Sequence, residues 1–259
     1  MSETTAGTGT ETGTETAYDL ATMTWEEVEA AYDRADLVIL PCGSHEQHST
    51  HLPVSVDSLR ADHLTAELVT SAENHELEIY RLPTLSYGFS EHHMQFPGTV
   101  TLSEQTYIET IIDIGHSLSE HDVDRLLLLN CHGGNKDSLS IAADRLQRDH
   151  DLTTHFIHWT AYATDLLEEQ FGDQWGHAGE HETSFVELYR PDLVVEAKKE
   201  PQTVSEMPQT RPYTYFDDIT KQGGLGDPTE SDSAYMETVV ERATDRILQA
   251  IADDIATGW

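Results

Sequence analysis

The chain has 259 residues, of which 48 are acidic and 14 basic, so its formal net charge is −34. A charge of this sign argues against nucleic acid and anionic membranes as partners. No stretch approaches the ~18 consecutive apolar residues that a membrane span needs. The start of the chain shows no basic segment followed by an apolar run, so no signal peptide is expected. Two cysteines give no disulfide framework, which favours a cytoplasmic location.

The acidic excess also predicts the solvent in which the protein works. Repulsion between like charges destabilises a compact state at low ionic strength. At about 1 M salt the Debye length falls to ~3 Å, and most of this repulsion is screened. Only four of the basic residues are lysine. The composition therefore predicts the cytoplasm of a halophile that accumulates salt.

The first residues differ in composition from the rest of the chain. Residues 1–17 repeat Thr, Gly and Glu with nothing apolar to bury, which predicts a disordered acidic tail. Thr24 followed by Glu27 is a capping-box pattern that opens a helix through about Tyr32. Residues 18–259 contain no internal repeat and no convincing linker, so we expect a single domain there.

Short apolar runs alternate with helical patterns along this domain. Continuous apolar runs are typical of parallel strands that are buried on both faces. The predicted strands are Leu37–Leu40, Ile79–Leu82, Leu126–Leu129, Thr154–His158 and Leu193–Glu196. The predicted helices are Ser58–Ala72, one capped by Ser103 and ending near Glu120, Lys136–His150, Ala161–Gln170, one starting near Glu182, and a last one from about Ala234. The alternation predicts βαβ units and an α/β fold with a mostly parallel sheet.

Histidine and carboxylate side chains follow two of the predicted strands directly. Glu46 and His48, with Asp57 shortly after them, follow the first strand, and His132 follows the Leu-rich one. Ligands of open α/β sheets bind outside the carboxyl ends of the strands, so we expect these side chains to meet at one rim. Imidazole and carboxylate together suit divalent Zn, Mn or Fe. An aspartate can bridge two such ions through its two oxygens.

Other catalytic patterns are missing from the sequence. It contains no His-Glu-x-x-His zincin motif and no Gly-x-Ser-x-Gly nucleophile elbow, so neither a zincin nor a serine hydrolase of that type is expected. Cys131, next to His132, could be a thiol nucleophile. A small buried apolar side chain is the favoured interpretation of this cysteine.

Four short segments together resemble the creatininase family of metal-dependent amidohydrolases. In family order they are Gly43-Ser44-x-Glu46-Gln47-His48 through His51-Leu52-Pro53 to Asp57, Phe96-Pro97-Gly98-Thr99, Asn130-x-His132-Gly133-Gly134-Asn135, and His177-Ala178-Gly179-Glu180-x-Glu182-Thr183-Ser184. Gly226-Asp227-Pro228 also fits, so the resemblance covers about residues 37 to 230. It implies a three-layer α/β/α fold with a mostly parallel sheet, often assembled as a homohexamer.

The resemblance also implies a site with two divalent metal ions, Zn, Mn or Fe. Asp57 would bridge them, with Glu46 and His132 serving one ion and His48 the other. A water activated by the metals would attack the amide carbonyl. His177 matches the family histidine that protonates the leaving nitrogen.

Two departures from the family pattern limit what the resemblance implies. Creatinine-cleaving members carry a glutamate two residues after the histidine of the third motif, and this chain has Gly134 there. Glu182 is expected to supply the missing ligand, and Glu180 is the second choice. Whichever of the two does not bind metal could orient His177 or shuttle its proton. Ser49 replaces the glycine that usually follows Glu-Gln-His.

Three further residues are predicted to contact a substrate, and a fourth, Lys136, is considered beside them. Ser90 matches a substrate-contact position of the family. Gly133 lets the backbone approach a ligand closely. Trp175 could close over a planar ring, or it could be a packing residue. Lys136 could contact a phosphate, although a lone lysine is more often solvated.

The expected function is metal-dependent hydrolysis of a C–N bond in a small cyclic amide similar to creatinine. One alternative is a deformylase that acts on a formylaminopyrimidine nucleotide in archaeal flavin and deazaflavin synthesis. The other alternative is a non-catalytic, metal-binding homologue. The expected partner is a small-molecule amide.

Overall fold

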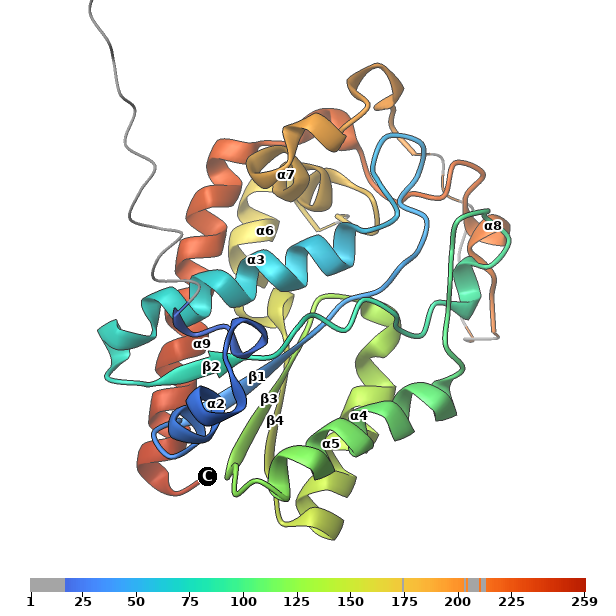
Figure 1. The fold of residues 1–259 in the computed structure, drawn as a ribbon. Helices are drawn as coiled ribbons and strands as arrows, with labels where there is room; N and C mark the ends of the chain where they lie inside the picture. Colours follow the sequence, from blue (N-terminus) through green and yellow to red (C-terminus); the bar gives the residue numbers. More distant parts are fainter. Residues whose placement is uncertain (1–16, 174, 203, 205–209, 211–212) are drawn as a thin grey trace, which may run out of the picture.

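A four-stranded parallel sheet lies at the centre of the protein (Figure 1). The computed structural model describes residues 17–173, 175–202, 204, 210 and 213–259, so nearly all of the predicted acidic tail lies outside the described residues. The strand order is β2-β1-β3-β4. The strands are β1 (Leu37–Cys42), β2 (Ile79–Arg81), β3 (Arg125–Asn130) and β4 (Thr153–His158).

Helices cover both faces of this sheet and complete the predicted three-layer α/β/α fold. Helices α3, α7 and α9 pack on one another on one face, and α4 and α5 form a pair on the other (Figure 1). The α-helices are α2 (Trp25–Tyr32), α3 (Val56–Ser71), α4 (Glu104–Ser119), α5 (Lys136–His150), α6 (Thr164–Phe171), α7 (Glu180–Tyr189), α8 (Phe216–Ile219) and α9 (Ser233–Thr257). Within the described residues, no helix combines the length and hydropathy that a bilayer crossing requires.

The apolar runs form strands because both faces of the sheet are buried. In β1, Leu37 and Ile39 belong to the core beneath α3 and α9, whereas Val38 and Leu40 belong to the core beneath α4 and α5. Successive side chains of a strand point to opposite faces. A strand between two helical layers must therefore be apolar at every position, as the sequence is here.

Most of the predicted elements are confirmed to within a few residues. Helix α2 begins where the capping box predicts, because the backbone N–H of Thr24 donates to Glu27 Oε2 at 2.7 Å. Helix α4 is capped by Ser103, whose Oγ accepts from Thr106 N at 3.3 Å. The predicted helix over 161–170 is shorter, since residues 159–162 form a 3₁₀ turn before α6.

The predicted strand Leu193–Glu196 is wrong. Two 3₁₀ turns, Pro191–Leu193 and Glu196–Lys198, include the first and last residues of this segment, and the two residues between them belong to no strand. The backbone N–H of Val195 donates to the carbonyl of His51 at 2.8 Å, in a loop rather than in a strand. Proline fixes φ and favours the start of such a turn. The apolar run therefore reflects packing beside a loop and not pairing in the sheet.

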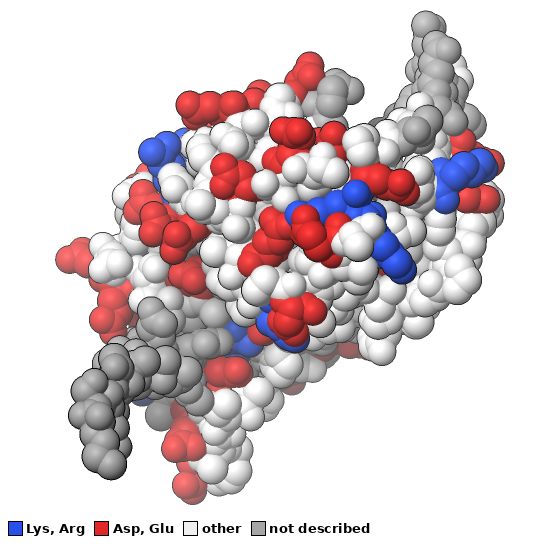
Figure 2. All heavy atoms as spheres, turned by 90° about the horizontal axis from the view of Figure 1, so that it is seen from above, with Lys and Arg blue, Asp and Glu red and all other residues white. Residues whose placement is uncertain are grey.

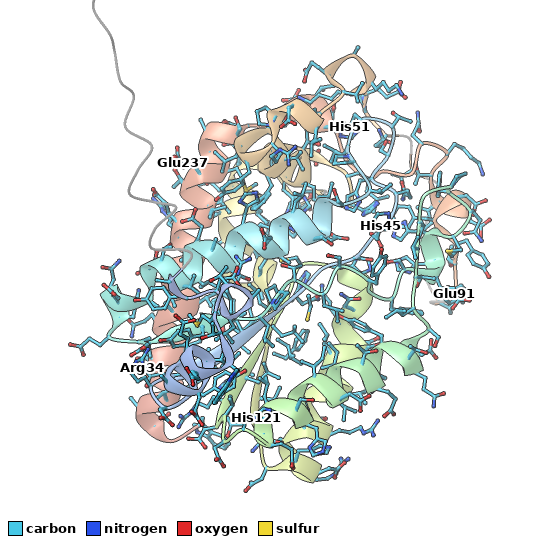
Figure 3. All side chains as sticks on the ribbon, viewed as in Figure 1. Arg34, His45, His51, Glu91, His121 and Glu237 are labelled. Atoms are coloured by element: carbon cyan, nitrogen blue, oxygen red, sulfur yellow. The ribbon has the colours of Figure 1, made fainter. Side chains whose placement is uncertain are left out.

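The strand register brings the loops after three strands to one rim of the sheet. Cys42 at the end of β1 pairs with Asn130 at the end of β3, and Asn130 pairs with His158 at the end of β4. Not all fifteen histidines lie at this rim. In Figure 3, His121 lies at the opposite end of the molecule from His45. The histidines and carboxylates at this rim are therefore a local cluster and not part of an even distribution over the molecule.

Salt is expected to stabilise this fold. Red carboxylates are spread over the face in Figure 2, and the few blue side chains lie beside red ones. The excess negative charge has no partner, so its repulsion should ease as the Debye length falls from ~10 Å at 0.1 M to ~3 Å at 1 M salt. We expect the midpoint of thermal unfolding to rise steadily with KCl concentration. Sucrose at equal osmolality is the uncharged control, and an equal rise in sucrose would contradict an electrostatic origin.

Candidate active site

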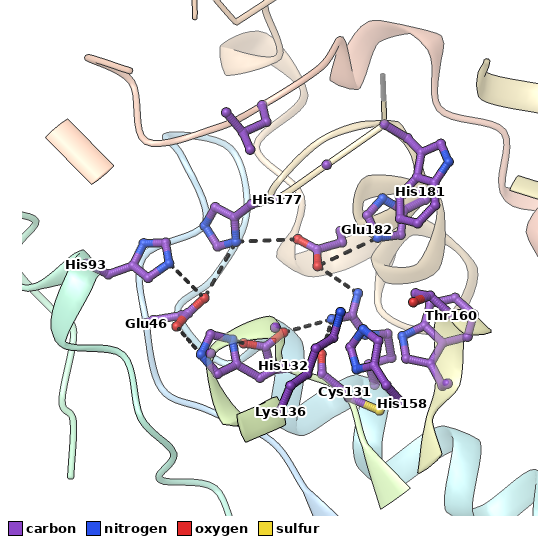
Figure 4. A pocket seen from close by; sticks show the side chains of 18 of the residues that line it. Glu46, His93, Cys131, His132, Lys136, His158, Thr160, His177, His181 and Glu182 are labelled. Carbon is purple, nitrogen blue, oxygen red and sulfur yellow. Dashed lines mark hydrogen bonds and ion pairs between the residues drawn. The ribbon is translucent and has the colours of Figure 1, made fainter. Parts of the chain in front are cut away.

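Six polar side chains from five segments converge at this rim. Figure 4 labels four of them: Glu46, His132, His177 and Glu182. Their segments are the loop after β1, the first turn of α3, the end of β3, the loop before α7, and the first turn of α7. All six were predicted as site residues from the sequence: Glu46, His48, Asp57, His132, His177 and Glu182.

Two of the carboxylates lie in the first turns of helices. Asp57 is in the first turn of α3, and Glu182 is in the first turn of α7. The positive end of the helix dipole favours a negative charge there. Ala178 adopts a left-handed φ of 52° before α7, and its backbone N–H donates to Glu182 Oε2 at 2.7 Å. The local fold thus holds both carboxylates ionised and fixed in position.

The first group of converging atoms joins Glu46, Asp57 and His132. Glu46 Oε2 lies 3.2 Å from His132 Nε2, and His132 Nδ1 lies 3.2 Å from Asp57 Oδ2. One candidate ligand atom from each residue lies within 4.8 Å of the others. This spacing suits a single divalent cation held by two carboxylates and one imidazole.

The second group joins His48, Asp57 and Glu182. His48 Nε2 lies 3.6 Å from Asp57 Oδ1 and 3.3 Å from Glu182 Oε2. His48 Nδ1 lies 3.1 Å from the carbonyl oxygen of Glu46, so a proton sits on Nδ1. Burial opposes a second proton at Nε2, but Asp57 and Glu182 outweigh it and raise the pKa of His48 well above its usual value. A bound cation would take the place of that second proton. Asp57 belongs to both groups, as a bridging ligand would.

Several buried atoms of these groups have no hydrogen-bond partner among the described residues. They are both carboxylate oxygens of Glu46, Nε2 of His48, and Oδ2 of Asp57. A buried polar atom without a partner is costly, roughly 1–3 kcal/mol each. Here the orphaned lone pairs face one another instead of being scattered. This donor set fits two divalent cations that share Asp57.

The electrostatics of the site keep its carboxyl groups ionised. Burial raises the pKa of Asp57, but His48 and His132 outweigh it and hold this pKa well below its usual value. Burial likewise opposes ionisation of Glu182, and Arg60 and His48 overcome it. For Glu46 the burial effect is outweighed by His132 and His177, so its pKa is also lowered. Ionised carboxylates are the form that binds a metal.

Arg60 is a site residue that the sequence analysis missed. Its Nη1 donates to Glu182 Oε1 and its Nη2 to Asp57 Oδ1, both at 2.8 Å, and it also donates to the carbonyl oxygen of Cys131. The guanidinium is buried and offsets part of the carboxylate charge. It also fixes the angle at which two carboxylates enter the site. The available sequence signal was its position three residues after Asp57, on the same helical face.

His177 carries its proton on the side away from the cluster. Its Nε2 donates to the carbonyl oxygen of Gln47 at 2.8 Å, so Nδ1 faces Glu46 Oε1 at 3.5 Å and Glu182 Oε2 at 3.9 Å. Burial and the nearby His48 lower the pKa of His177, despite the carboxylates. A neutral imidazole with this orientation can accept a proton at Nδ1 and return it. The same nitrogen, with Glu46 and His48, also forms a third possible metal-binding group.

Besides His48, two predicted site residues do not line the pocket at these side chains, namely Glu180 and Ser90. Glu180 Oε1 accepts from the backbone N–H of Asp227 at 2.5 Å, so its side chain holds the loop at Gly226 and Asp227. Ser90 is completely buried, with its Oγ 2.5 Å from Ser44 Oγ and 3.2 Å from His132 Nε2. Glu180 is therefore placed to support a loop, and Ser90 to support His132, rather than to contact a substrate directly.

A pocket of about 260 Å³ opens onto the converging side chains. Gly133 and Trp175, which are predicted to contact a substrate, are among the residues that line it. Trp175 packs edge-on against His181 with ring centroids 4.9 Å apart. His93 also lines the pocket, with Nε2 3.4 Å from Glu46 Oε1, and this residue had been given no role from the sequence. Other lining residues without a predicted role include His92, His158, Thr160, Phe216 and Leu225.

The second cysteine of the chain is a buried packing residue and not an activated thiol. Cys131 belongs to the core beneath α3 and α9. Burial raises the pKa of its thiol to about 12 despite the nearby Arg60. A thiol with such a pKa is not ionised near neutral pH and is a poor nucleophile.

The glycine at position 134 is enforced by its surroundings. A Cβ added there would overlap the carbonyl oxygen of Phe89 and Nε2 of His132, and would lie 2.8 Å from His92 Cε1. No side chain fits at this position without moving the loop that carries Phe89. The carboxylate of the second group is therefore supplied by another residue, and the geometry places Glu182 there.

Adjacent glycines offer a matched pair of substitutions. Gly134→Ala is expected to destabilise the protein by about 1–3 kcal/mol, the usual cost of overpacking, and to weaken metal retention by displacing His132. Gly133→Ala is the control, because nothing lies within 4 Å of its added Cβ. Thermal unfolding and metal content by mass spectrometry check both. Equal unfolding midpoints and equal metal contents of the two variants would mean that the loop carrying Phe89 moves at no cost, which would contradict this account of Gly134.

Proteins of known class share both the sequence pattern and the fold of this chain. The fold and the donor groups are those of a metal-dependent hydrolase that acts on C–N amide bonds. The sequence model of the creatininase family, described as creatinine amidohydrolase, matches residues 21–251. The chain belongs to the creatininase family and is an amidohydrolase of that family.

Similar proteins include enzymes with different substrates. The chain is 31% identical over 191 residues to creatinine amidohydrolase of Pseudomonas putida, covering 66% of this chain and 72% of that one. It is 27% identical over 219 residues to the mycofactocin precursor peptide peptidase of Mycolicibacterium smegmatis, covering 82% and 84%. A crystal structure of creatinine amidohydrolase superposes with a TM-score of 0.82 at 25% identity, covering 92% and 97%. Further creatininase structures are a manganese form and a Zn–Zn form of a mutant.

Proposed function

We propose that the chain hydrolyses a small amide with two divalent metal ions, Zn, Mn or Fe. Glu46 and His132 would hold one ion, His48 and Glu182 the other, and Asp57 both. The observation that carries this proposal is the set of buried lone pairs that face one another without hydrogen-bond partners. When bound, such a metal pair polarises the carbonyl and lowers the pKa of water from 15.7 towards ~7.

The protein's own residues would position the reactants and move the proton. His177 Nδ1 faces the cluster, so it can take a proton from the attacking water and deliver it to the leaving nitrogen. Its Nε2–H bond to the carbonyl of Gln47 keeps the ring in the orientation that this transfer needs. Arg60 would hold Asp57 and Glu182 in place throughout.

The substrate proposed is a small cyclic amide similar to creatinine. A pocket of about 260 Å³ matches a molecule of that size, and Trp175 offers a flat apolar wall. A formamide of a formylaminopyrimidine nucleotide is the second candidate, favoured by the replacement of the family glutamate with Gly134 and by Lys136 at the pocket. The peptidase among the relatives adds short peptide amides to the substrates worth testing.

The test is a panel assay for amine or formate release by protein purified in high salt. The panel contains creatinine, related lactams, a formylaminopyrimidine nucleotide and short peptides, assayed after Zn, Mn or Fe is supplied. Turnover of a lactam supports the first candidate, and turnover of the formamide alone supports the second. No turnover of any member would favour the non-catalytic, metal-binding homologue.

The enzyme's assembly and its location in the cell are also part of the proposal. We propose a homohexamer by analogy with the family, and a cytoplasmic location in a halophilic archaeon from the charge and the cysteine count. Size-exclusion chromatography with light scattering, in about 1 M salt so that surface charge is screened, measures the assembly.

A further inference from the structure

One wall of the pocket is lined by hydrogen-bond donors that the proposed chemistry does not use. These donors are the ammonium of Lys136, a ring nitrogen of His158 and the hydroxyl of Thr160. Lys136 is the first residue of α5, His158 is the last residue of β4, and Thr160 lies in the 3₁₀ turn that follows. The candidate metal-binding groups come chiefly from other segments, after β1 and at the starts of α3 and α7. Lys136, His158 and Thr160 are labelled in Figure 4.

The hydrogen bonds of Asn130 determine which nitrogen of His158 carries the proton. Asn130 Oδ1 accepts from the backbone N–H of His132 at 3.1 Å, and Nδ2 donates to the carbonyl of His132 at 2.7 Å. These two backbone bonds fix which amide atom is nitrogen. The same Nδ2 lies 3.0 Å from His158 Nδ1 and must donate to it. The proton of the neutral ring is therefore on Nε2, which makes Nε2 a donor.

His158 stays neutral in this environment. Burial, Lys136 and Arg60 lower the pKa of His158 to about 3. Lys136 and His158 line the same pocket. A neutral donor beside an ammonium suits an acceptor that carries negative charge.

Neither Lys136 nor Thr160 uses its side-chain donor elsewhere in the described part of the chain. No described carboxylate lies within ion-pair distance of the Lys136 ammonium, although the protein has 48 acidic residues and only four lysines. By contrast, Lys199 pairs with Glu187 and Glu196. Arg60, the other cation of the pocket, already donates to two carboxylates and a carbonyl.

We infer that Lys136, His158 and Thr160 form a subsite for an anionic oxygen group, a carboxylate or a phosphate, carried by the amide substrate. This inference rests on the proposed function, because it places the substrate's amide at the metal-binding groups of the same pocket. An anionic substrate is otherwise disfavoured by a chain of net charge −34. The subsite would offset that repulsion at the point of binding and select acidic amides over neutral ones.

Calorimetric binding of matched probes to the metal-loaded enzyme at constant salt tests the subsite. The probes are N-acetylglycine, its neutral analogue N-acetylglycinamide, and N-acetylaminomethylphosphonate. We expect Lys136→Met to weaken binding of the better acidic probe by about tenfold or more, as for loss of a charge-assisted hydrogen bond. The neutral probe should change by less than about twofold. The preferred acidic probe distinguishes a carboxylate from a phosphate.

Two further variants keep the inference falsifiable. Thr160→Val should weaken the acidic probe severalfold with unchanged thermal unfolding. Lys221→Met is the control, because it makes the same change in charge at an exposed residue whose ammonium donates to a backbone carbonyl. Equal affinity of wild type and Lys136→Met for the acidic probe, equal losses for all probes, or no acidic binding by the wild type would each overturn the inference. Binding needs no turnover, so this result is separate from any failure of the proposed hydrolysis.

Discussion

Replacing Asp57 by asparagine is expected to remove most of the bound metal and to reduce the rate of hydrolysis by more than about 100-fold. This loss exceeds the roughly 10–100-fold effect that is typical when a residue hydrogen-bonded to a metal ligand is replaced. Asp57 is the residue shared by the two candidate metal groups, with one oxygen towards each. Asparagine keeps the shape of the side chain but removes its negative charge. The measurements are metal content by mass spectrometry and turnover of the best panel substrate.

The control for this variant is a surface aspartate on another helix. Asp113 is exposed on α4, on the opposite face of the sheet from α3, so Asp113→Asn makes the same change in charge without touching the site. Metal content and turnover should match those of the wild type. If Asp57→Asn retained both metals, the proposed bridging role of Asp57 would be wrong.

Replacing His177 by alanine is expected to leave metal content unchanged and to reduce turnover by about 10²–10⁴-fold, the range for loss of a general acid–base group. The reason is the orientation of the ring, with Nε2 bonded to Gln47 and Nδ1 facing the carboxylates. Metal content separates this role from ligation, because a ligand variant would lose metal as well as activity.

Exposed histidines provide the comparison for this variant. His121 lies on the surface at the opposite end of the molecule from the site, so His121→Ala should change neither metal content nor turnover (Figure 3). Normal turnover of His177→Ala would show that another group moves the proton. A parallel loss of metal and activity would instead assign His177 to the third metal-binding group.

The strands could be predicted from sequence because each is buried on both faces. Leu126–Leu129 has no polar position, which only a strand between two helical layers tolerates over so short a length. The segment Leu193–Glu196, which was wrongly predicted as a strand, is also a short apolar run in the sequence. Leu193 and Val194 pack against a small core that includes Leu52, and the backbone N–H of Val195 donates to the carbonyl of His51. These are tertiary contacts, for which the sequence carries no local signal.

The clustering of the candidate metal ligands could be predicted from the sequence, but the residue that supports them could not. Glu46, His48, Asp57 and His132 follow strands whose carboxyl ends must share a rim, so their convergence follows from topology. Arg60 gave no comparable signal, because its second partner, Glu182, is 122 positions away. An arginine on a helix is usually solvated, and only the packing of α3 against α7 shows that this one is buried.

The measurement that tests the central claim most directly is metal content per chain, followed through removal and return of the metal. Protein purified in high salt should carry about two divalent ions per chain, as a site with a bridging carboxylate requires. Chelation should abolish turnover of the panel substrate, and Zn, Mn or Fe should restore it. Full activity after complete removal of metal, or no binding of any of the three ions, would contradict the two-metal account of this site.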